Sequence, residues 1–413
     1  MSDTRSVVVV GTGVGGLKVA EALRQLGFDG SLTLIGDEPG APYDRPPLSK
    51  DVLKGTKPNP PYLLNDDEFT ALNVTLLSGS AATALDSIKQ QIELADGSQV
   101  PYDVLVVATG ARARPWGLGD GLSNVFSLRT AADAALIAPL IAQRGHLALL
   151  GAGFIGCEVA ASAREMGCSV TLIEMLPTPL AHIVGPEAGQ QIARMHLQAG
   201  VDLRCETTIE DLESDGDRMV AMTLSDGTRI EADALVVGVG VNPNTEWLES
   251  GGLIVDNGIV CDAVGATSHA NIYAIGDVAR WVNVQTGRHN RVEHWTNASD
   301  HAAIVARHIA EGTHERKPLE EIPYFWSDQY GTKIQSIGEP SASADLTMLL
   351  SGAAGDRPLF LYSRGKRLTG VLGFGLARAV MRLRALIAEG APIGQAVDVI
   401  RELHPQSQLT TID

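Results

Sequence analysis

One short pattern occurs twice in this chain of 413 residues, and it restricts the possible folds more than any other feature. The segment "VVVVGTGVGG" (7–16) joins a β-branched run to a G-x-G-x-x-G motif, and a stretch of helical spacing and a second apolar run, "SLTLIGD" (31–37), follow it. The segment "LALLGAGFIG" (147–156) repeats this order and leads through a helical stretch to "SVTLIE" (169–174). A strand, a glycine-rich turn, a helix and a second strand form a dinucleotide-binding unit. The duplication therefore predicts two dinucleotide sites on Rossmann-like domains.

The glycines of each motif have separate tasks. The first makes a tight turn, the second lets the backbone approach a pyrophosphate, and the last lets the helix pack closely on the strand. The N–H groups at the start of the helix can then bind the phosphates. These glycines are Gly11, Gly13 and Gly16 in the first copy and Gly151, Gly153 and Gly156 in the second.

An acidic residue at the end of the second strand can accept hydrogen bonds from ribose hydroxyls. Asp37 fills this position in the first copy, with Glu38 as the alternate, and Glu174 fills it in the second. A carboxylate repels the 2′-phosphate of NADP, and "MLPTP" (175–179), which follows Glu174, contains no arginine that could bind that phosphate. We therefore expect NADH at the second site and FAD at the first.

The composition excludes several other classes of protein. The net charge of −17 argues against non-specific nucleic-acid binding, which needs a basic surface. No apolar run is as long as a membrane span and no signal-peptide pattern precedes "RSVVVVGTG" (5–13), so we expect a cytoplasmic protein that does not bind membranes. No C-x-x-C pair or zinc-type Cys/His spacing occurs, so we expect no metal site. The cysteines are expected to be buried, apolar-like residues: Cys157, Cys168, Cys205 and Cys261.

Two further segments support a flavin. The segment "YDVLVVATGARARP" (102–115) has the pattern of a strand that ends at Ala108-Thr109-Gly110, and "NIYAIGDVA" (271–279) has the pattern of a strand that ends at Gly276-Asp277. They resemble the places where, in FAD reductases, the chain leaves the flavin domain and an aspartate meets the ribityl chain. The alternative for Asp277 is the N-cap of a helix.

These segments predict an α/β protein with two Rossmann-like domains in a glutathione-reductase-like arrangement. The FAD-binding domain is discontinuous, with residues 1–111 and 247–322, and the NAD-binding domain, 112–246, is inserted into it. The segment "VVGVGVNPNTEWLESGGL" (236–253) resembles the crossover that returns to the FAD domain. Residues 323–413 are expected to form a small α+β C-terminal domain with strands and then one helix, "ARAVMRLRALIAEG" (377–390).

The motifs together resemble those of the FAD-dependent NADH:ferredoxin reductases that serve ring-hydroxylating dioxygenases and bacterial P450s, the putidaredoxin reductase-like family. The likeness covers essentially the whole chain, in family order and spacing. Its segments are "GTGVGG", "PYDRPPLSK" (42–50), "ATG", "GAGFIGCE", "IGDVAR" and "YFWSDQYG" (324–331). Two departures are Cys157, where the family usually has leucine, and "RHNRVEH" (288–294).

The resemblance implies roles for individual residues. Lys50 would lie beside the isoalloxazine ring of FAD, Glu158 would face the nicotinamide and hold Lys50, and Trp326 would cover the nicotinamide side. These three are the candidate catalytic residues. Arg129, Asp277 and Trp295 would contact FAD, and the other candidates for cofactor binding are Gly15, Arg45, Ala82, Ala108, Thr109, Gly110, Ile155, Gly240 and Gly276.

The route by which electrons leave follows from a missing residue. Flavin disulfide reductases carry their cysteines in the segment that is "GAPYDRPPLSKDVLKG" (40–55) here, and this segment has none. Electrons are therefore expected to pass from FAD directly to a small iron–sulfur protein. We expect a [2Fe–2S] ferredoxin, with a rubredoxin as the alternative. The alternatives are an NADH oxidase or peroxidase and a redox-sensing flavoprotein like apoptosis-inducing factor. The protein would be a monomer or homodimer.

The expected docking surface is basic, because ferredoxins are usually acidic and the chain as a whole is acidic. Residues 323–413 hold nine Lys and Arg against eight Asp and Glu, so this part is nearly neutral. The candidates in it are Lys333, Arg378, Arg382 and Arg384, and the alternative is a solvated helix surface.

Overall fold

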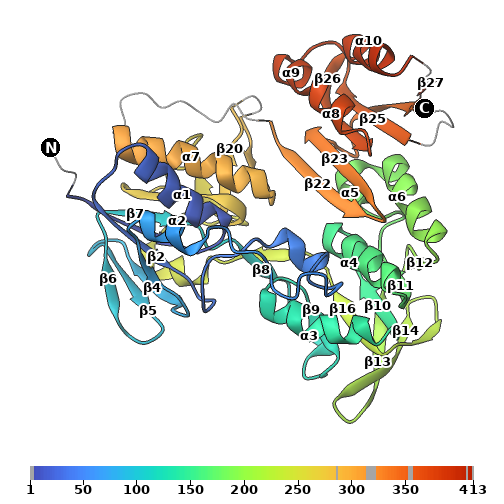
Figure 1. Cartoon of the computed structure of the whole chain (residues 1–413), viewed down its shortest axis with the longest axis horizontal. Helices are drawn as coiled ribbons and strands as arrows, with labels where there is room; N and C mark the ends of the chain where they lie inside the picture. Colours follow the sequence, from blue (N-terminus) through green and yellow to red (C-terminus); the bar gives the residue numbers. More distant parts are fainter. Residues whose placement is uncertain (1–3, 285–286, 313–321, 352–356, 406–407, 412–413) are drawn as a thin grey trace. The chain divides into compact units, whose positions relative to one another are not determined.

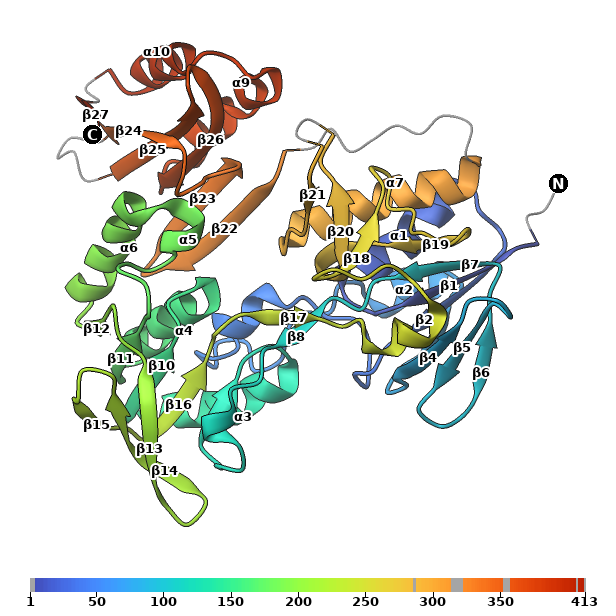
Figure 2. The ribbon, with the colours of Figure 1, turned by 180° about the vertical axis from the view of Figure 1, so that it is seen from behind.

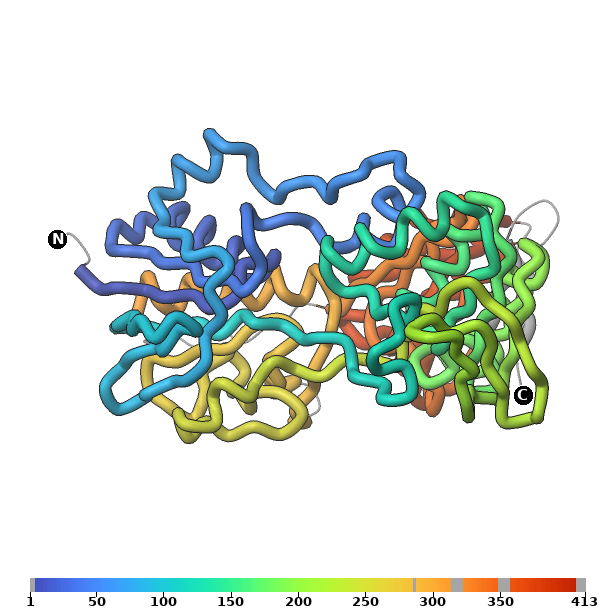
Figure 3. Tube along the Cα trace, turned by 90° about the horizontal axis from the view of Figure 1, so that it is seen from below, coloured from blue at the N-terminus to red at the C-terminus, as the bar shows by residue number. Residues whose placement is uncertain are grey.

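The computed structural model describes residues 4–284, 287–312, 322–351, 357–405 and 408–411. The chain divides into two compact units, each made of separate stretches. Unit 1 comprises residues 1–44, 61–112 and 241–321, and unit 2 comprises residues 45–60, 113–240 and 322–413. The tube in Figure 3 lets the reader follow these stretches by colour. The three-domain division predicted from the sequence stays a proposal.

Unit 1 contains a five-stranded parallel sheet in the order β19-β7-β1-β2-β3. Its central strand β1 (Ser6–Val10) is a run of four valines, each at most 3% exposed, as expected for a strand covered on both faces. Helices α1 (Val14–Gln25) and α7 (Trp295–Glu311) pack against each other beside this sheet (Figure 1). The other strands are β2 (Ser31–Ile35), β3 (Thr75–Leu77), β7 (Val104–Val107) and β19 (Ile272–Ala274).

Three small sheets and short helices complete unit 1. Strands β4 (Ala82–Asp86), β5 (Gln91–Leu94) and β6 (Gln99–Pro101) form an antiparallel sheet. A second sheet consists of β18 (Ile259–Cys261), β20 (Ala279–Val282) and β21 (His289–Asn290), and can be followed in Figure 2. Strands β8 (Ala111–Ala113) and β17 (Val241–Pro243) form a two-stranded ribbon. The short helices are α2 (Asp66–Ala71), η3 (Glu246–Gly251) and η4 (Gly276–Val278).

Unit 2 contains the second parallel sheet, in the order β12-β11-β10-β16-β9. Its strands are β9 (Val125–Ser127), β10 (His146–Leu150), β11 (Ser169–Ile173), β12 (Asp202–Arg204) and β16 (Ala234–Val237). Between β12 and β16, the chain forms a separate antiparallel sheet of β13 (Ile209–Asp215), β14 (Arg218–Leu224) and β15 (Arg229–Glu231). The helices are η1 (Pro46–Ser49), η2 (Gly117–Gly119), α3 (Ala131–Ala142), α4 (Phe154–Glu165), α5 (Ala181–Val184) and α6 (Pro186–Gln198).

The C-terminal part of unit 2 is a six-stranded antiparallel sheet in the order β22-β23-β26-β25-β24-β27, with three helices. The strands are β22 (Tyr324–Gln329), β23 (Thr332–Gly338), β24 (Asp345–Ser351), β25 (Arg357–Arg364), β26 (Arg367–Phe374) and β27 (Gln408–Thr411). The helices are α8 (Ala377–Arg382), α9 (Arg384–Glu389) and α10 (Ile393–Leu403). This arrangement confirms the predicted α/β fold class with its small α+β part.

One detail of the C-terminal part differs from the sequence prediction. The segment 377–390, expected to be one helix, forms the two short helices α8 and α9. Leu383 lies at the junction and is fully buried, in the same core cluster as Val380 and Ile387. The break lets both short helices pack on β23 and β26. Arg384 therefore starts α9 and does not share a helix with Arg378 and Arg382.

Over the residues that the structure describes, no helix has both the length and the apolar character needed to cross a membrane.

Candidate active site

The glycine turn after β1 has the geometry expected of a phosphate-binding turn. Gly11 has a φ of +116°, and a Cβ there would lie 2.1 Å from the carbonyl oxygen of Ala108. A Cβ on Gly16 would lie 1.9 Å from the carbonyl oxygen of Gly11. A Cβ on Gly13, in contrast, would meet no described atom within 4 Å. Gly11 and Gly16 are therefore needed for close packing, while Gly13 leaves open space for a ligand.

The turn after β10 repeats this geometry in unit 2. Gly151 has a φ of +99°, and a Cβ there would lie 2.4 Å from the carbonyl oxygen of Gly238. A Cβ on Gly156 would lie 2.0 Å from the carbonyl oxygen of Gly151, and one on Gly153 would meet no described atom within 4 Å. Gly240 follows Gly238 and accepts a backbone hydrogen bond from Arg114. The two turns thus provide two separate open cradles.

The helices that follow these turns begin without a side-chain cap. Gly13 is the N-cap of α1 and Gly153 the N-cap of α4, and no described side chain accepts a hydrogen bond from the first turn of either helix. Helices α2 and α3, in contrast, have complete capping boxes, with Asn65 and Thr130 as N-caps. The first N–H groups of α1 and α4 therefore stay available to an anion.

The two copies differ at the residue that follows the second strand. In unit 2, Glu174 accepts hydrogen bonds from the backbone N–H of Ala152 at 2.6 Å and of Leu176 at 2.9 Å. The N–H of Gly151 donates to the carbonyl of Ile173, and in the first copy the N–H of Gly11 donates to the carbonyl of Ile35. Ile35 therefore corresponds to Ile173, and the next residue, Gly36, corresponds to Glu174. A Cβ on Gly36 would lie 2.4 Å from the hydroxyl of Thr12, which takes up this space. Asp37 therefore lies one position farther along than its counterpart.

The remaining residues near the first turn are arranged around the ends of parallel strands. Asp37 accepts from the N–H of Glu38, and Glu38 accepts from the Tyr43 hydroxyl at 2.5 Å. The backbone of Gly79 donates to Glu38, and Ala82 begins β4 three residues later. Residues 108–110 follow β7, and the Thr109 hydroxyl donates to the carbonyl of Asn244. In an open parallel sheet, ligands bind at these carboxyl ends of the strands.

Asp277 lies in the turn η4 after β19, where two side chains fix the backbone. The N–H of Gly276 donates to Nδ1 of His301 at 3.3 Å, and Arg291 donates to the carbonyl of Asp277 at 3.2 Å. His301 is stacked on Trp281 with ring centroids 3.6 Å apart, and burial lowers the pKa of His301 to about 3. A neutral imidazole can accept the bond from Gly276 at any physiological pH. A Cβ on Gly15 would contact Ile275, so the first turn lies next to this one.

Trp295 and the arginine candidates have definite partners. Trp295 starts α7 and donates its indole N–H to Asp44 at 2.9 Å within unit 1. In unit 2, Arg45 donates to the backbone carbonyl of Arg129 at 2.7 Å, so these two predicted FAD contacts lie together. Ile155, in the first turn of α4, is 43% exposed.

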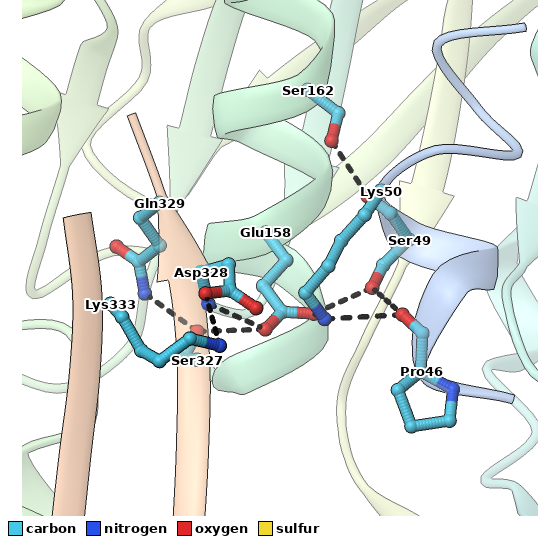
Figure 4. A network of polar contacts seen from close by, with 9 residues as sticks. All are labelled: Pro46, Ser49, Lys50, Glu158, Ser162, Ser327, Asp328, Gln329 and Lys333. Carbon is cyan, nitrogen blue, oxygen red and sulfur yellow. Dashed lines mark hydrogen bonds and ion pairs between the residues drawn. The ribbon is translucent and has the colours of Figure 1, made fainter. Parts of the chain in front are cut away.

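Lys50 and Glu158 form the close ion pair that the sequence predicted. Figure 4 shows the Lys50 ammonium directed at Glu158. Lys50 Nζ lies 2.6 Å from Glu158 Oε2, and the side chains are 17% and 5% exposed. Lys50 also donates to the carbonyl of Pro46 at 3.1 Å. Ser49 donates to the same Glu158 oxygen at 2.5 Å. The other oxygen, Oε1, accepts from the Ser327 hydroxyl at 2.9 Å and from the backbone N–H of Asp328 at 3.2 Å.

Trp326 lies on the opposite face of β22 from Ser327. It is half-buried and stacks on Tyr324 with ring centroids 5.9 Å apart. The ammonium of Lys333 lies 5.8 Å from the Trp326 ring centroid and pairs with Asp328 at 2.7 Å. Lys50 thus contacts Glu158 directly, and Glu158 is hydrogen-bonded to β22, the strand that contains Trp326.

The four cysteines are unpaired thiols, and none belongs to a disulfide. Cys157, Cys168 and Cys261 are buried as expected, but Cys205 is partly exposed because it follows the end of the edge strand β12. Burial raises the pKa of Cys205 to about 11 and raises the pKa of Cys157 well above its usual range. The reactive thiolate form is therefore disfavoured at both sites.

The sequence analysis missed the side chains that surround the candidate residues. Ser49, Ser327 and Gln329 belong to the network of Glu158, and Arg291 and His301 hold the Asp277 turn. Only one signal could have found any of them. In "FWSDQ" the alternation of a strand places Ser327 and Gln329 on one face with Phe325, and two polar residues on a buried face require polar partners.

The sequence matches two family models. The pyridine nucleotide-disulphide oxidoreductase family matches residues 5–302, and the reductase C-terminal family matches residues 324–402.

Individual proteins match along nearly the whole chain. Rhodocoxin reductase of Rhodococcus erythropolis is 37% identical over 94% of this chain and 90% of its own length. Putidaredoxin reductase of Pseudomonas putida is 36% identical over 90% of this chain and 89% of its own length. A chain in the crystal structure of the covalent putidaredoxin reductase–putidaredoxin complex superposes with a TM-score of 0.90 at 32% identity, covering 97% of this chain and 99% of that one.

Proposed function

The chain belongs to the pyridine nucleotide-disulphide oxidoreductase family, and on that basis we propose that it is an NADH-dependent ferredoxin reductase. It transfers electrons from NADH through FAD to a small iron–sulfur ferredoxin that feeds an oxygenase, as do the ferredoxin reductase components among its relatives. The observation that carries this proposal is the pair of open glycine cradles in a chain whose segment 40–55 offers no thiol.

The cradle in unit 1 fits FAD. Gly13 leaves space for a pyrophosphate, the first turn of α1 lacks a side-chain cap, and the Asp277 turn lies beside it. FAD supplies the redox chemistry, because it accepts a hydride and releases electrons one at a time. Asp37 or Glu38 would bind the adenosine ribose, and Asp277 the ribityl chain or pyrophosphate.

The cradle in unit 2 fits NADH. Gly153 leaves open space, and Glu174 is held beside the turn by two backbone N–H groups. Ribose hydroxyls can donate to the oxygens of this carboxylate, whereas a 2′-phosphate would be repelled. Ile155 exposes an apolar surface on the first turn of α4 for the nicotinamide half of the coenzyme.

Lys50 would supply a fixed positive charge for the negative charge that reduced FAD carries. Its ammonium is held by Glu158 and by the carbonyl of Pro46, so no reorganisation is needed when that charge develops. Glu158 acts through Lys50, and Trp326 would cover the nicotinamide side. The assignment of the other cofactor-binding candidates is part of the same proposal. So is a cytoplasmic location, which the four unpaired cysteines favour.

The acceptor distinguishes this function from its alternatives. We expect NADH-dependent reduction of a [2Fe–2S] ferredoxin to be much faster than reduction of oxygen by the same preparation. Initial rates with ferredoxin, rubredoxin and oxygen, measured at equal NADH concentration, test this. A rate with oxygen equal to that with ferredoxin would favour an oxidase. A slow rate with every acceptor, together with a change of oligomeric state on reduction, would favour a redox sensor.

Three of the four predicted docking residues are exposed, which supports a docking surface made of these three. Arg378 and Arg382 are exposed on α8, and Lys333 is exposed on β23. The backbone N–H of Gly375, just before α8, donates to the carbonyl of Lys333, so the strand and the helix start lie together. Arg384 starts α9 and is only partly exposed.

Reversing Arg378 and Arg382 to Glu is expected to raise the KM for ferredoxin about tenfold at low salt and to weaken its salt dependence. The rate with ferricyanide should not change, because this small acceptor needs no docking surface. Arg401→Glu is the matched control, since Arg401 is exposed on α10 of the same sheet domain. An equal loss with both acceptors would show damage to the fold or the flavin site and would move the docking surface elsewhere.

A further inference from the structure

The Glu158 carboxylate is saturated with protein donors. Each of its two oxygens accepts two hydrogen bonds, and the side chain is almost fully buried. A carboxylate has about four acceptor positions, so none is left for a coenzyme. Glu158 therefore works as a fixed negative charge whose orientation depends on its donors.

The donors to the two oxygens come from different parts of unit 2. Oε2 receives Ser49 and Lys50 from the segment that contains η1, whereas Oε1 receives Ser327 and the backbone of Asp328 from β22 (Figure 4). The strand β22 is at the edge of its sheet. It is joined to β23 by the two-residue turn Tyr330-Gly331, both with positive φ.

This hairpin explains why the backbone of Asp328 reaches Glu158. Gln329 and Thr332 flank the turn and form the first pair of the ladder, so Asp328 and Lys333 form the next, non-hydrogen-bonded pair. The N–H of Asp328 then points away from β23, on the open edge of the sheet. Glu158 accepts from this otherwise unpaired donor.

The Glu158 carboxylate determines the direction of the Ser327 hydroxyl, and Gln329 supports that direction by donating to Ser327. Gln329 and Ser327 are buried, at 1% and 0% exposed, and Gln329 Nε2 lies 3.1 Å from Ser327 Oγ. An ionised carboxylate only accepts, so Ser327 must donate its single proton to Glu158. The amide of Gln329 must then present its N–H₂ group to Ser327. It does so even though its own oxygen is buried without a hydrogen-bond partner among the described residues.

We infer that Ser327 and Gln329 are positioning residues for the Lys50–Glu158 pair. By holding Oε1 of Glu158, they aim Oε2 at Lys50 and so fix the position of the ammonium group. Trp326 precedes Ser327 on the opposite face of the same strand. The expected effect on the rate of flavin reduction rests on the proposed function, whereas the positioning of Glu158 does not.

Ser327→Ala is expected to slow the reduction of bound flavin by NADH about tenfold, because one of the two hydrogen bonds to Oε1 is lost and the orientation of Glu158 is held less firmly. The NADH concentration at half-saturation should stay unchanged. Ser327→Thr keeps the hydroxyl and should restore most of the rate. Ser336→Ala is the matched control, because Ser336 is a fully buried serine of the same hairpin whose hydroxyl donates to Val371 instead.

A second measurement does not depend on activity. In a crystal structure of Ser327→Ala, the separation of Lys50 Nζ and Glu158 Oε2, 2.6 Å in the native chain, should lengthen or divide between two positions. Gln329→Leu should change the separation in the same way, and it replaces Ser327→Ala in this test if Ser327→Ala does not fold. An unchanged separation in both variants, or an equal loss of rate in Ser336→Ala, would overturn the inference. A native chain that fails to reduce ferredoxin would overturn the proposed function alone.

Discussion

Replacing Lys50 with Met is expected to lower the rate constant for flavin reduction by NADH about 100-fold while FAD stays bound. The substitution removes a positive charge that is held in a fixed position, and no other described cation contacts Glu158. FAD should stay bound because the glycine turn and the Asp277 turn in unit 1 are unchanged. Stopped-flow absorbance gives the rate constant, and the flavin-to-protein absorbance ratio gives the occupancy.

Two further variants separate the loss of charge from damage to the fold. Lys50→Met alone leaves Glu158 buried without its counter-ion, which should cost about 3 kcal/mol of the free energy of unfolding. Lys50→Met with Glu158→Gln should recover much of this stability, because the Gln amide can donate to Ser49 while its oxygen accepts from Ser327. The rate constant should stay low in the double variant. A double variant that regains the native rate would show that Lys50 has only a structural role.

Lys54→Met is the matched control for the single substitution. Lys54 lies four residues from Lys50 and pairs with Glu165 at 3.1 Å, away from the Glu158 network. Its replacement should leave the rate constant within about twofold of the native value, since exposed ion pairs contribute little.

Glu174→Ala is expected to lower kcat/KM for NADH by roughly 10- to 100-fold and to lower the value for NADPH much less, so that the preference for NADH narrows. The native chain should strongly prefer NADH. In the proposed site the carboxylate would accept from the ribose hydroxyls of NADH and would repel the 2′-phosphate of NADPH. Steady-state kinetics with both coenzymes at a fixed concentration of ferricyanide measure the two values.

The same substitution also removes two hydrogen bonds from the turn, so it needs a control for structure. Glu174→Gln keeps one acceptor for the N–H of Ala152. Its kcat/KM for NADH should lie between the values of the native chain and of Glu174→Ala. Glu210→Ala removes one exposed negative charge from β13 and should leave kcat/KM unchanged for both coenzymes. A native chain that uses NADPH as well as NADH would contradict the role given to Glu174.

The local features of the nucleotide sites could be predicted because they depend on neighbours in sequence. Gly16 must lack a side chain because a Cβ there would meet the carbonyl oxygen of Gly11 in the same strand–turn–helix segment, and Gly13 leaves open space in that segment. The same holds for the turn in unit 2. The run of four valines in β1 likewise indicates a strand buried on both faces.

The spacing of the two motifs could not decide which residue of the first copy corresponds to Glu174 of the second. Asp37 and Glu174 look alike in sequence, but the backbone register pairs Glu174 with Gly36. The space that Glu174 enters beside Ala152 is filled in the first copy by the side chain of Thr12. Loops of different length hide this shift, because the strands β2 and β11 begin at different distances from their helices.

The sequence by itself determined the two dinucleotide turns, the fold class and the pairing of Lys50 with Glu158, since motif order and family spacing carry that information. Only the tertiary structure decided what holds the pair in place. Ser49 lies 109 positions before Glu158 and Ser327 lies 169 positions after it. The strand alternation in "FWSDQ" indicates that Ser327 needs a polar partner, but no local pattern identifies that partner as Glu158. Their role arises because a buried carboxylate must have all its acceptor positions satisfied, and the fold alone brings those donors together.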